Sequence, residues 1–148
     1  MKTDNLEKYN EDFNDALNIY ENEYLHDDLI NLLKYGSVAQ KQAAALKLDC
    51  INNRSDARVF MSNLTGCDGK IREAVSFRLI EFVNEKPELF VEYADIFLDA
   101  IIDINGNICR NTICAIKNLQ NFSEFTNPFC TKLCNYAFEL AKKAEKFD

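Results

Sequence analysis

The chain has a single histidine, and acidic residues follow it directly. His26 precedes Asp27 and Asp28 in the tripeptide HDD. A histidine beside carboxylates can bind a metal ion or move protons, because the imidazole titrates close to neutral pH. Metal sites built on such His-Asp pairs need several further histidines, and the sequence contains none. The sequence therefore favours neither a ligand role nor a catalytic role for His26.

Four of the six cysteines fall into two spacings that could hold a metal ion. Cys109 and Cys114 form a C-x4-C pair, and Cys130 and Cys134 form a C-x3-C pair. Structural zinc sites favour tighter C-x2-C pairs near glycine, whereas these cysteines fall within predicted helices. The N-terminal segment lacks the apolar stretch of a secretory signal, and no apolar run has the length of a membrane span. We therefore expect a cytoplasmic protein with reduced cysteines packed as small hydrophobic residues, and no metal or cofactor.

Sequence patterns of the common catalytic sites are absent. The chain has no glycine-rich phosphate loop, no nucleophile elbow and no dinucleotide-binding fingerprint. Its many carboxylates fall on exposed helix faces and not in apolar pockets that would raise a pKa. We therefore predict that the protein is not an enzyme.

The acidic charge is concentrated at the N-terminus. The chain of 148 residues has a net charge of −7, and residues 1–28 hold nine acids and two lysines, a balance of −7. The remaining residues hold fifteen acids and fifteen bases. Such a chain is poorly suited to bind nucleic acid or an anionic membrane through bulk charge. It is better suited to a basic protein partner.

Two predicted helices place carboxylates opposite an apolar stripe. The first runs from Thr3 to about Tyr20, with its apolar stripe expected to face inward and Glu7, Glu11, Asp12 and Asp15 on the other faces. The inward stripe comprises Leu6, Tyr9, Phe13, Ala16, Leu17 and Tyr20.

The second acidic helix is predicted to run from Pro87 to about Ile104. Its five carboxylates fall within a sector of about 80°, and no basic residue interrupts them. Like charges at this spacing cost a few tenths of a kcal/mol each, which a basic partner would relieve. A solvated face that keeps the protein soluble is the alternative. The predicted partner-binding residues of this helix are Glu88, Glu92, Asp95, Asp99 and Asp103.

Three segments of the chain share one pattern. Segments 35–51, 68–84 and 105–121 align on Gly36, Gly69 and Gly106, which are separated by 33 and 37 residues. Their shared positions follow one stripe of an α-helix, and a period in this range is typical of stacked helical repeats. The columns are Val38, Ile71 and Ile108; Gln42, Val75 and Thr112; Ala45, Arg78 and Ala115; Leu46, Leu79 and Ile116; and Asp49, Phe82 and Leu119.

The middle segment resembles the second helix of a HEAT repeat. It opens with Asp68, continues through Gly-Lys-Ile to Arg72, and then places small and apolar residues down one face. The other two copies have Ala39 and Cys109 at the arginine position. The resemblance implies that Arg72 is held against carboxylates in the turns and has a structural role. HEAT-like folds serve many functions, so the fold alone does not fix one.

The predicted architecture is a single all-α domain, since the chain has only four glycines and two prolines and no sustained strand pattern. The resemblance implies a short right-handed α-solenoid of about three and a half HEAT-like helical pairs. We expect a capping helix in 1–22, repeats in 23–53, 54–85 and 86–122, and a C-terminal capping helix in 123–148. Ser37 with Gln40 should form a capping box, and Asn127 with Pro128 should begin the last helix.

The predicted function is protein binding without catalysis, by a chain that is monomeric on its own. Its size, acidity and lack of an active site resemble, by type, small immunity proteins of bacterial toxin systems. The most concrete prediction is therefore an acidic inhibitor that binds and neutralises a basic, nuclease-type toxin domain. The alternative is a scaffold or adaptor that binds a partner on the concave face lined by the second helices. That alternative depends on Lys41, Lys70, Glu73, Phe77, Arg110 and Asn111.

Overall fold

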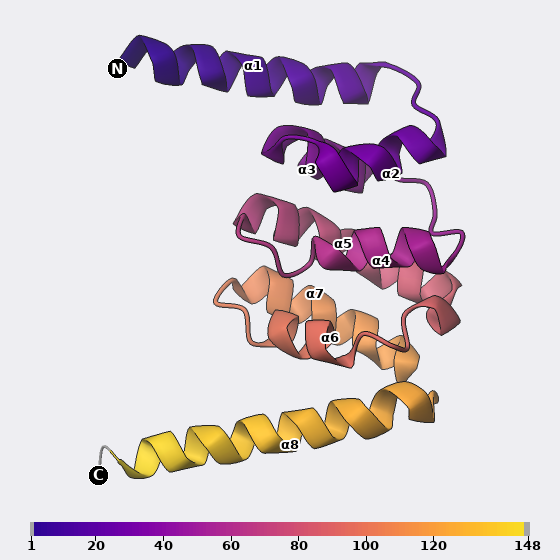
Figure 1. Ribbon diagram of the computed structural model, residues 1–148, viewed down its shortest axis with the longest axis vertical. Coiled ribbons are helices and arrows are strands. Elements are labelled where there is room, and N and C mark those ends of the chain that lie inside the picture. Colours follow the sequence, from indigo (N-terminus) through magenta and orange to yellow (C-terminus); the bar gives the residue numbers. More distant parts are fainter. Residues whose placement is uncertain (1, 147–148) are drawn as a thin grey trace.

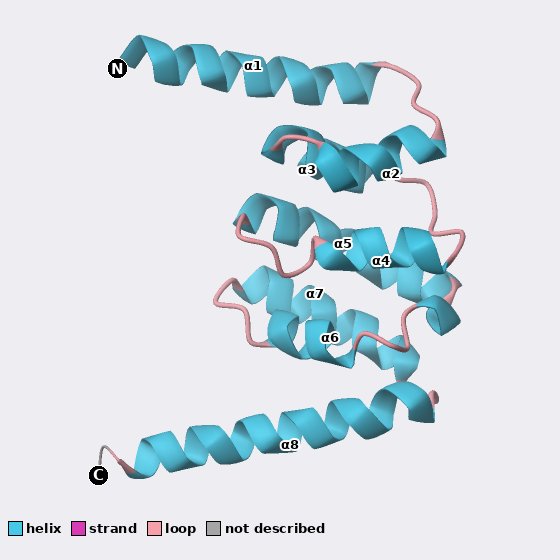
Figure 2. Ribbon diagram, viewed as in Figure 1, coloured by secondary structure: helices cyan, strands magenta, loops and turns pink. Residues whose placement is uncertain are grey.

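The computed structural model describes residues 2–146 and is built from helices joined by short loops, with no strand in that range (Figures 1 and 2). This confirms the all-α class. The helices are α1 (Lys2–Glu21), α2 (His26–Tyr35), α3 (Val38–Lys47), α4 (Arg54–Ser62), α5 (Gly69–Glu85), η1 (Pro87–Leu89), α6 (Ala94–Ile101), α7 (Gly106–Ile116), η2 (Lys117–Leu119) and α8 (Ser123–Glu145).

The helices lie in two layers that extend along the long axis of the molecule (Figure 1). In one layer α1 contacts α3, α3 contacts α5, and α5 contacts α7. In the other layer α2 contacts α4, and α6 contacts α8. Helices α2 and α3 also contact each other across the layers, as do α6 and α7. The first helix therefore shares a layer with α3, whereas the last helix shares a layer with α6.

The core lies between the layers and is rich in phenylalanine. Phe60 of α4 meets Phe82 of α5 edge to face, with ring centres 5.2 Å apart, and Phe97 meets Phe125 in the same way at 5.3 Å. All four rings are buried, as edge-to-face aromatic pairs in cores usually are. The predicted helix stripe is buried in the second and third copies, at Ile71, Val75, Leu79 and Phe82 and at Ile108, Thr112, Ala115 and Leu119. The first copy departs from it, because Val38 and Asp49 are exposed.

Polar side chains at the helix ends match the expected pattern. Ser37 and Gln40 form the predicted capping box of α3, and the Asp68 carboxylate accepts from the first backbone N–H groups of α5. Arg72 donates from Nε to Oδ2 of Asp103 at 2.8 Å and from Nη1 to the carbonyl of Gly66. The expectation that Arg72 is held against a carboxylate in the turns is confirmed.

The predicted helix from Pro87 to Ile104 is wrong as a continuous element. Residues Pro87–Leu89 form a short 3-10 helix, a turn follows, and α6 begins only at Ala94. Proline fixes the first turn, and the N–H of Phe90 bonds to the carbonyl of Pro87, which closes that turn. Phe90, Ala94 and Phe97 are all buried at helical spacing across the break, so the apolar pattern continued where the helix did not.

The last helix begins where the predicted range 123–148 begins, and not at Asn127 and Pro128. Helix α8 starts at Ser123, and Pro128 lies inside it and not at its first position. The earlier start brings Phe125 into the core, where it stacks on Phe129 at 5.1 Å and meets Phe97. Pro128 cannot donate a helical hydrogen bond, and the burial of Phe125 offsets part of the cost of a proline inside the helix.

Helix α1 is oriented differently from the prediction. Within residues 6–21 of α1 the buried residue is Ile19, and Asp12, Asp15 and Ala16 are half-buried. Helix α1 packs on α3, whose buried Ala43, Ala44 and Ala45 are small, and the Lys47 ammonium donates to the carbonyl of Ile19. The apolar stripe expected to face inward is instead largely exposed at Leu6, Tyr9, Phe13, Leu17 and Tyr20.

Gly36 is required by a close approach between backbone atoms. A Cβ atom at this position would lie 2.6 Å from the carbonyl oxygen of Leu32, which is too short for a real contact. We predict that Gly36→Ala lowers the free energy of unfolding by about 1–3 kcal/mol, because the end of α2 must shift. Urea unfolding followed by circular dichroism measures the change.

Gly106→Ala is the matched control for that prediction. A Cβ atom there meets nothing within 4 Å, and the residue is the first of α7. Alanine should leave stability unchanged or raise it by up to about 1 kcal/mol. Equal losses from both substitutions would contradict the role assigned to Gly36.

Candidate functional site

The predicted acidic residues of α1 do not all face solvent. Glu7 and Glu11 are exposed, whereas Asp12 and Asp15 are half-buried on the side that holds Ile19. The N-terminal acidic surface that a partner could reach therefore centres on Glu7 and Glu11.

Three of the five carboxylates predicted on the helix after Pro87 form ion pairs with basic residues from other parts of the chain. Glu92 lies 3.7 Å from Arg54, Asp95 lies 2.6 Å from Lys132, and Asp103 bonds to Arg72. These bases are distant in sequence, so the sequence pattern did not reveal them.

The Arg72 pair differs from the other two because it is enclosed. Asp103 is the more shielded partner, with a side chain only 9% exposed. Burial opposes its ionisation, but the hydrogen bond from Arg72 and the N–H of Asn105 outweigh this and hold the pKa of Asp103 below its usual range. Asp103 is therefore a structural carboxylate, whereas Glu88 and Asp99 remain exposed.

A hollow of about 440 Å³ opens on the layer formed by α3, α5 and α7. We call it the α3–α5–α7 groove. It is lined by Gln42, Leu46, Lys70, Glu73, Ala74, Phe77, Asn107 and Asn111. Four of the six residues predicted for the concave face, namely Lys70, Glu73, Phe77 and Asn111, meet here. Lys41 instead lines another hollow, beside α4, and Arg110 is exposed outside the groove.

Hydrogen bonds fix the polar wall of the groove. The Glu73 carboxylate accepts from the side-chain amides of Asn107 at 3.0 Å and Asn105 at 3.4 Å. Asn111 donates to the hydroxyl of Ser76 at 3.2 Å. These bonds run from α5 to α7 and its N-cap, so they hold α5 and α7 in register.

Phe77 is the most distinctive residue in the groove. Its side chain is 61% exposed, although its neighbours Ser76 and Val75 on α5 are buried. A large aromatic ring exposed among amides and one lysine is a typical anchor for a protein partner. The sequence had placed Phe77 off the main apolar stripe, and this position is the one signal that could identify it.

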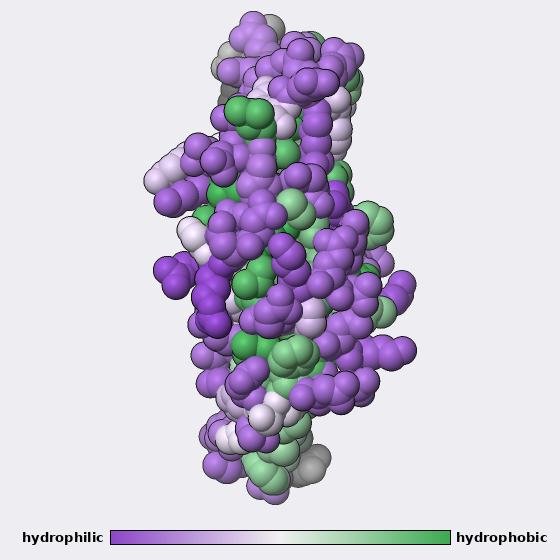
Figure 3. All heavy atoms as spheres, turned by 90° about the vertical axis from the view of Figure 1, so that its right-hand side faces the viewer, coloured by the Kyte–Doolittle hydropathy of each residue, from purple (hydrophilic) through white to green (hydrophobic). Residues whose placement is uncertain are grey.

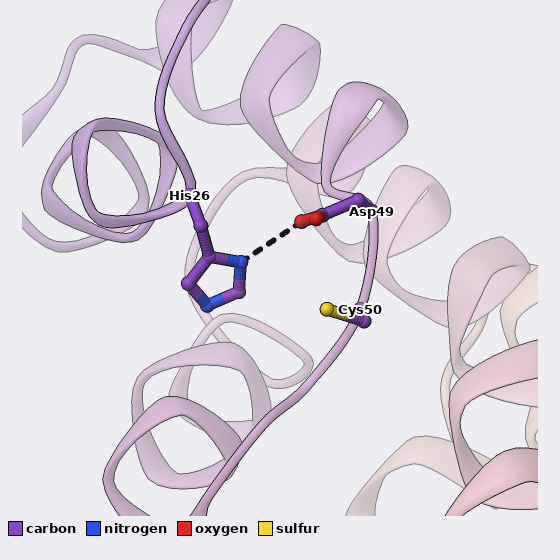
Figure 4. Close-up of side chains that lie close together, drawn as sticks. All are labelled: His26, Asp49 and Cys50. Atoms are coloured by element: carbon purple, nitrogen blue, oxygen red, sulfur yellow. Dashed lines mark hydrogen bonds and ion pairs between the residues drawn. The ribbon is translucent and has the colours of Figure 1, made fainter.

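His26 is clamped between two carboxylates. Its Nδ1 lies 2.8 Å from Oδ1 of Asp49, and its Nε2 lies 2.7 Å from Oδ2 of Asp56 (Figure 4 shows the Asp49 contact). Asp56 is buried and also accepts from the backbone N–H of Asn52. The contacts join the start of α2 to the loop between α3 and α4 and to the first turn of α4.

The double contact favours a protonated imidazole. Ionised carboxylates only accept hydrogen bonds, so both ring nitrogens donate at once only in the imidazolium form. Burial opposes that charge, but the hydrogen bonds and charges of Asp49 and Asp56 outweigh it and raise the pKa of His26 above its usual range. The hydrogen bond from His26 in turn lowers the pKa of Asp49. The sequence suggested Asp27 and Asp28 as neighbours, yet both partners come from later in the chain.

His26, Asp49 and Cys50 are also close enough to be considered as a cation site, with candidate ligand atoms within 4.8 Å of one another (Figure 4). The arrangement fits a proton better than a metal ion. A metal about 2 Å from both Nδ1 and the carboxylate would separate those two atoms by about 3.3 Å, more than a hydrogen-bond distance. Burial raises the pKa of the Cys50 thiol, which donates to Asn52, so the thiolate that metals require is disfavoured.

The other cysteines differ in part from the prediction. Cys67, Cys114, Cys130 and Cys134 are exposed, so these four are not packed as core residues. Cys109 is half-buried. Cys114, Cys130 and Cys134 lie on the exposed faces of α7 and α8, and Cys67 lies in the loop before α5.

Comparison with known proteins found no matching family model, no similar curated protein and no similar solved structure. Among residues 2–146, none of the helices combines the length and apolar character needed to cross a membrane.

The His26 clamp predicts a pH-dependent stability. Because the pKa is raised in the folded protein, this stabilisation is complete below the ordinary value of 6.5 and is lost as the pH rises through the folded pKa. We predict that the free energy of unfolding falls as the pH rises above the ordinary histidine value of 6.5 and through the raised folded pKa. His26→Gln should lower stability at the acidic end and flatten the dependence.

Nuclear magnetic resonance of the one histidine gives the pKa directly, and a chelator in a parallel sample removes any metal contribution. A metal ion at the site would compete with the proton and lower the apparent pKa. A His26 pKa at or below the ordinary value, with chelator present, would contradict the clamp.

Proposed function

We propose that this chain is a non-catalytic protein-binding module with a HEAT-like α-solenoid arrangement. The two helical layers, the neighbours in each layer and the Arg72–Asp103 contact support this arrangement. Stacked helical pairs provide a continuous surface on which a partner can make many aligned contacts. The single observation that carries the proposal is the α3–α5–α7 groove with Phe77 exposed in it.

The chemistry of the groove supports binding and not catalysis. Its two charged residues are Lys70 and Glu73, and Glu73 is already engaged by asparagine amides. Gln42, Asn107 and Asn111 each carry both a donor and an acceptor, as a peptide group does. Amides around an exposed aromatic ring suit a polypeptide segment that presents its backbone and one apolar side chain.

The residue expected to contribute most to binding is Phe77. We predict that Phe77→Asp weakens partner binding by about thirtyfold or more, as the loss of a binding hot spot does. The partner is identified by crosslinking from a photoreactive residue placed at position 77 in the native host, and its affinity is then measured with purified proteins.

Tyr35→Asp provides the control, because Tyr35 is 77% exposed and lies on α2 in the other layer. This variant should bind as the original protein does, and both variants should unfold at similar denaturant concentrations. Equal loss of affinity in the two variants would argue against the groove.

The second candidate is an inhibitor of a basic protein, by type an immunity protein that neutralises a nuclease-type toxin domain. The observation that favours it is the charge of −7 within residues 1–28, with Glu7 and Glu11 exposed on α1. Exposed carboxylates on one helix can steer a cationic partner and raise its association rate. Glu88 and Asp99 would extend this surface, whereas Asp103 is held by Arg72.

Charge reversal separates the two candidates. In the inhibitor case Glu7→Lys with Glu11→Lys should slow association with the partner by about tenfold at low salt, and the effect should shrink as salt is added. Glu139→Lys, an exposed acid on α8, is the control. Stopped-flow measurement of association at two salt concentrations tests this, and unchanged rates in the double variant would exclude the inhibitor case.

A further inference from the structure

The two ends of the molecule expose apolar helix faces that complement each other. At one end α1 presents Leu6, Tyr9, Phe13, Leu17 and Tyr20 at helical spacing, all exposed. At the other end an apolar hollow of about 520 Å³ lies between α7 and α8, where Ile113, Ile116, Phe125 and Phe129 line it. We call this hollow the α7–α8 groove.

The layers explain why both faces are open. Helix α8 contacts α6 and so occupies the place of the first helix of a pair, but no second helix follows it in the described chain. Helix α1 contacts α3 and so occupies the place of the second helix of a pair, with no first helix before it in residues 2–146. Each end therefore offers what the other end lacks.

The directions of the helices are also compatible. In Figure 1, α1 runs toward the right-hand edge of the stack, which is the side that faces the viewer in Figure 3, and α8 starts at that edge and runs away from it. A second copy placed beyond α8, in the same orientation, would bring its α1 antiparallel to α8. This is the relation that α2 and α3 have within one chain.

Charge favours this contact over one between two identical ends. Residues 6–21 of α1 hold five acids and one lysine, a balance of −4. Residues 106–119 of α7 and η2 hold Arg110, Lys117 and no acid, a balance of +2, and Lys117 lines the α7–α8 groove. Two α1 helices facing each other would repel, whereas α1 against α7 and η2 would attract.

We propose that α1 of one copy docks in the α7–α8 groove of a second copy, so that α8 and the incoming α1 complete a helical pair between two chains. This proposal differs from the sequence-based expectation that the chain is monomeric on its own. The contact joins two different surfaces, so it is heterologous and continues to further copies unless a ring closes. It does not involve the α3–α5–α7 groove, so it is independent of the function proposed for that groove.

Two variants that disable opposite ends test the proposal. Phe13→Glu places a charge on the exposed α1 stripe, and Ile113→Glu places one at the α7–α8 groove; both side chains are more than half exposed, so the fold should tolerate them. The original protein should form species larger than a dimer as its concentration rises from about 1 µM to about 200 µM. Each variant alone should remain monomeric, with association weakened by about tenfold or more.

Mixing the two variants gives the decisive result. The intact groove of the Phe13→Glu chain can accept the intact α1 of the Ile113→Glu chain, so an equimolar mixture should form a one-to-one dimer that grows no further. Sedimentation velocity measures these states, circular dichroism verifies the fold of each variant, and Phe77→Glu should associate as the original protein does. A monomeric original protein at all concentrations, or a mixture that stays monomeric, would overturn the proposal. So would loss of association in the Phe13→Glu variant but not in the Ile113→Glu variant, which indicates contact between two α1 helices.

Discussion

Each helical pair is tied to the next by polar side chains that reach across about one repeat. His26 bonds to Asp56 across 30 residues, Asn63 to the carbonyl of Leu33 across 30, and Arg72 to Asp103 across 31. Apolar stripes alone would allow two helical layers to slide, because hydrophobic contact has little directionality. The directional bonds fix the offset between pairs, and the α3–α5–α7 groove depends on that offset. Its wall is held by the same kind of contact, from Glu73 to Asn107 across 34 residues.

The sequence predicted what depends on local spacing. The buried stripe in α5 and α7, the Ser37 capping box and the Asp68 cap are each set by residues a few positions apart, and the structure has all three. It did not predict the break before α6, since the buried residues keep helical spacing across the turn. Nor did it predict the orientation of α1, because packing on α3 through Ile19 and the bond from Lys47 are contacts between distant segments.

In the candidate site, too, the sequence predicted what depends on local spacing and missed the contacts between distant segments. Lys70, Glu73 and Phe77 belong to one helix, so their common position on α5 followed from helical geometry. The partners of the acidic residues could not be deduced, since Arg54, Arg72 and Lys132 come from three other elements. Because three of the five carboxylates are paired with these bases, part of the repulsion among them is relieved within the chain itself. The charge argument for a basic partner therefore depends on Glu7 and Glu11 more than on α6.

Helix α1 carries exposed acidic residues as well as the apolar stripe through which we propose that it self-associates. Glu7 and Glu11 lie on the same helix as the apolar Tyr9 and Phe13, so one helix carries both the acidic surface and the apolar stripe. A copy docked through α1 would cover part of that acidic surface. A basic partner that binds α1 would then compete with self-association, and by mass action it would shift the chains toward the free form. The α3–α5–α7 groove lies away from both ends, so binding there would be compatible with either state.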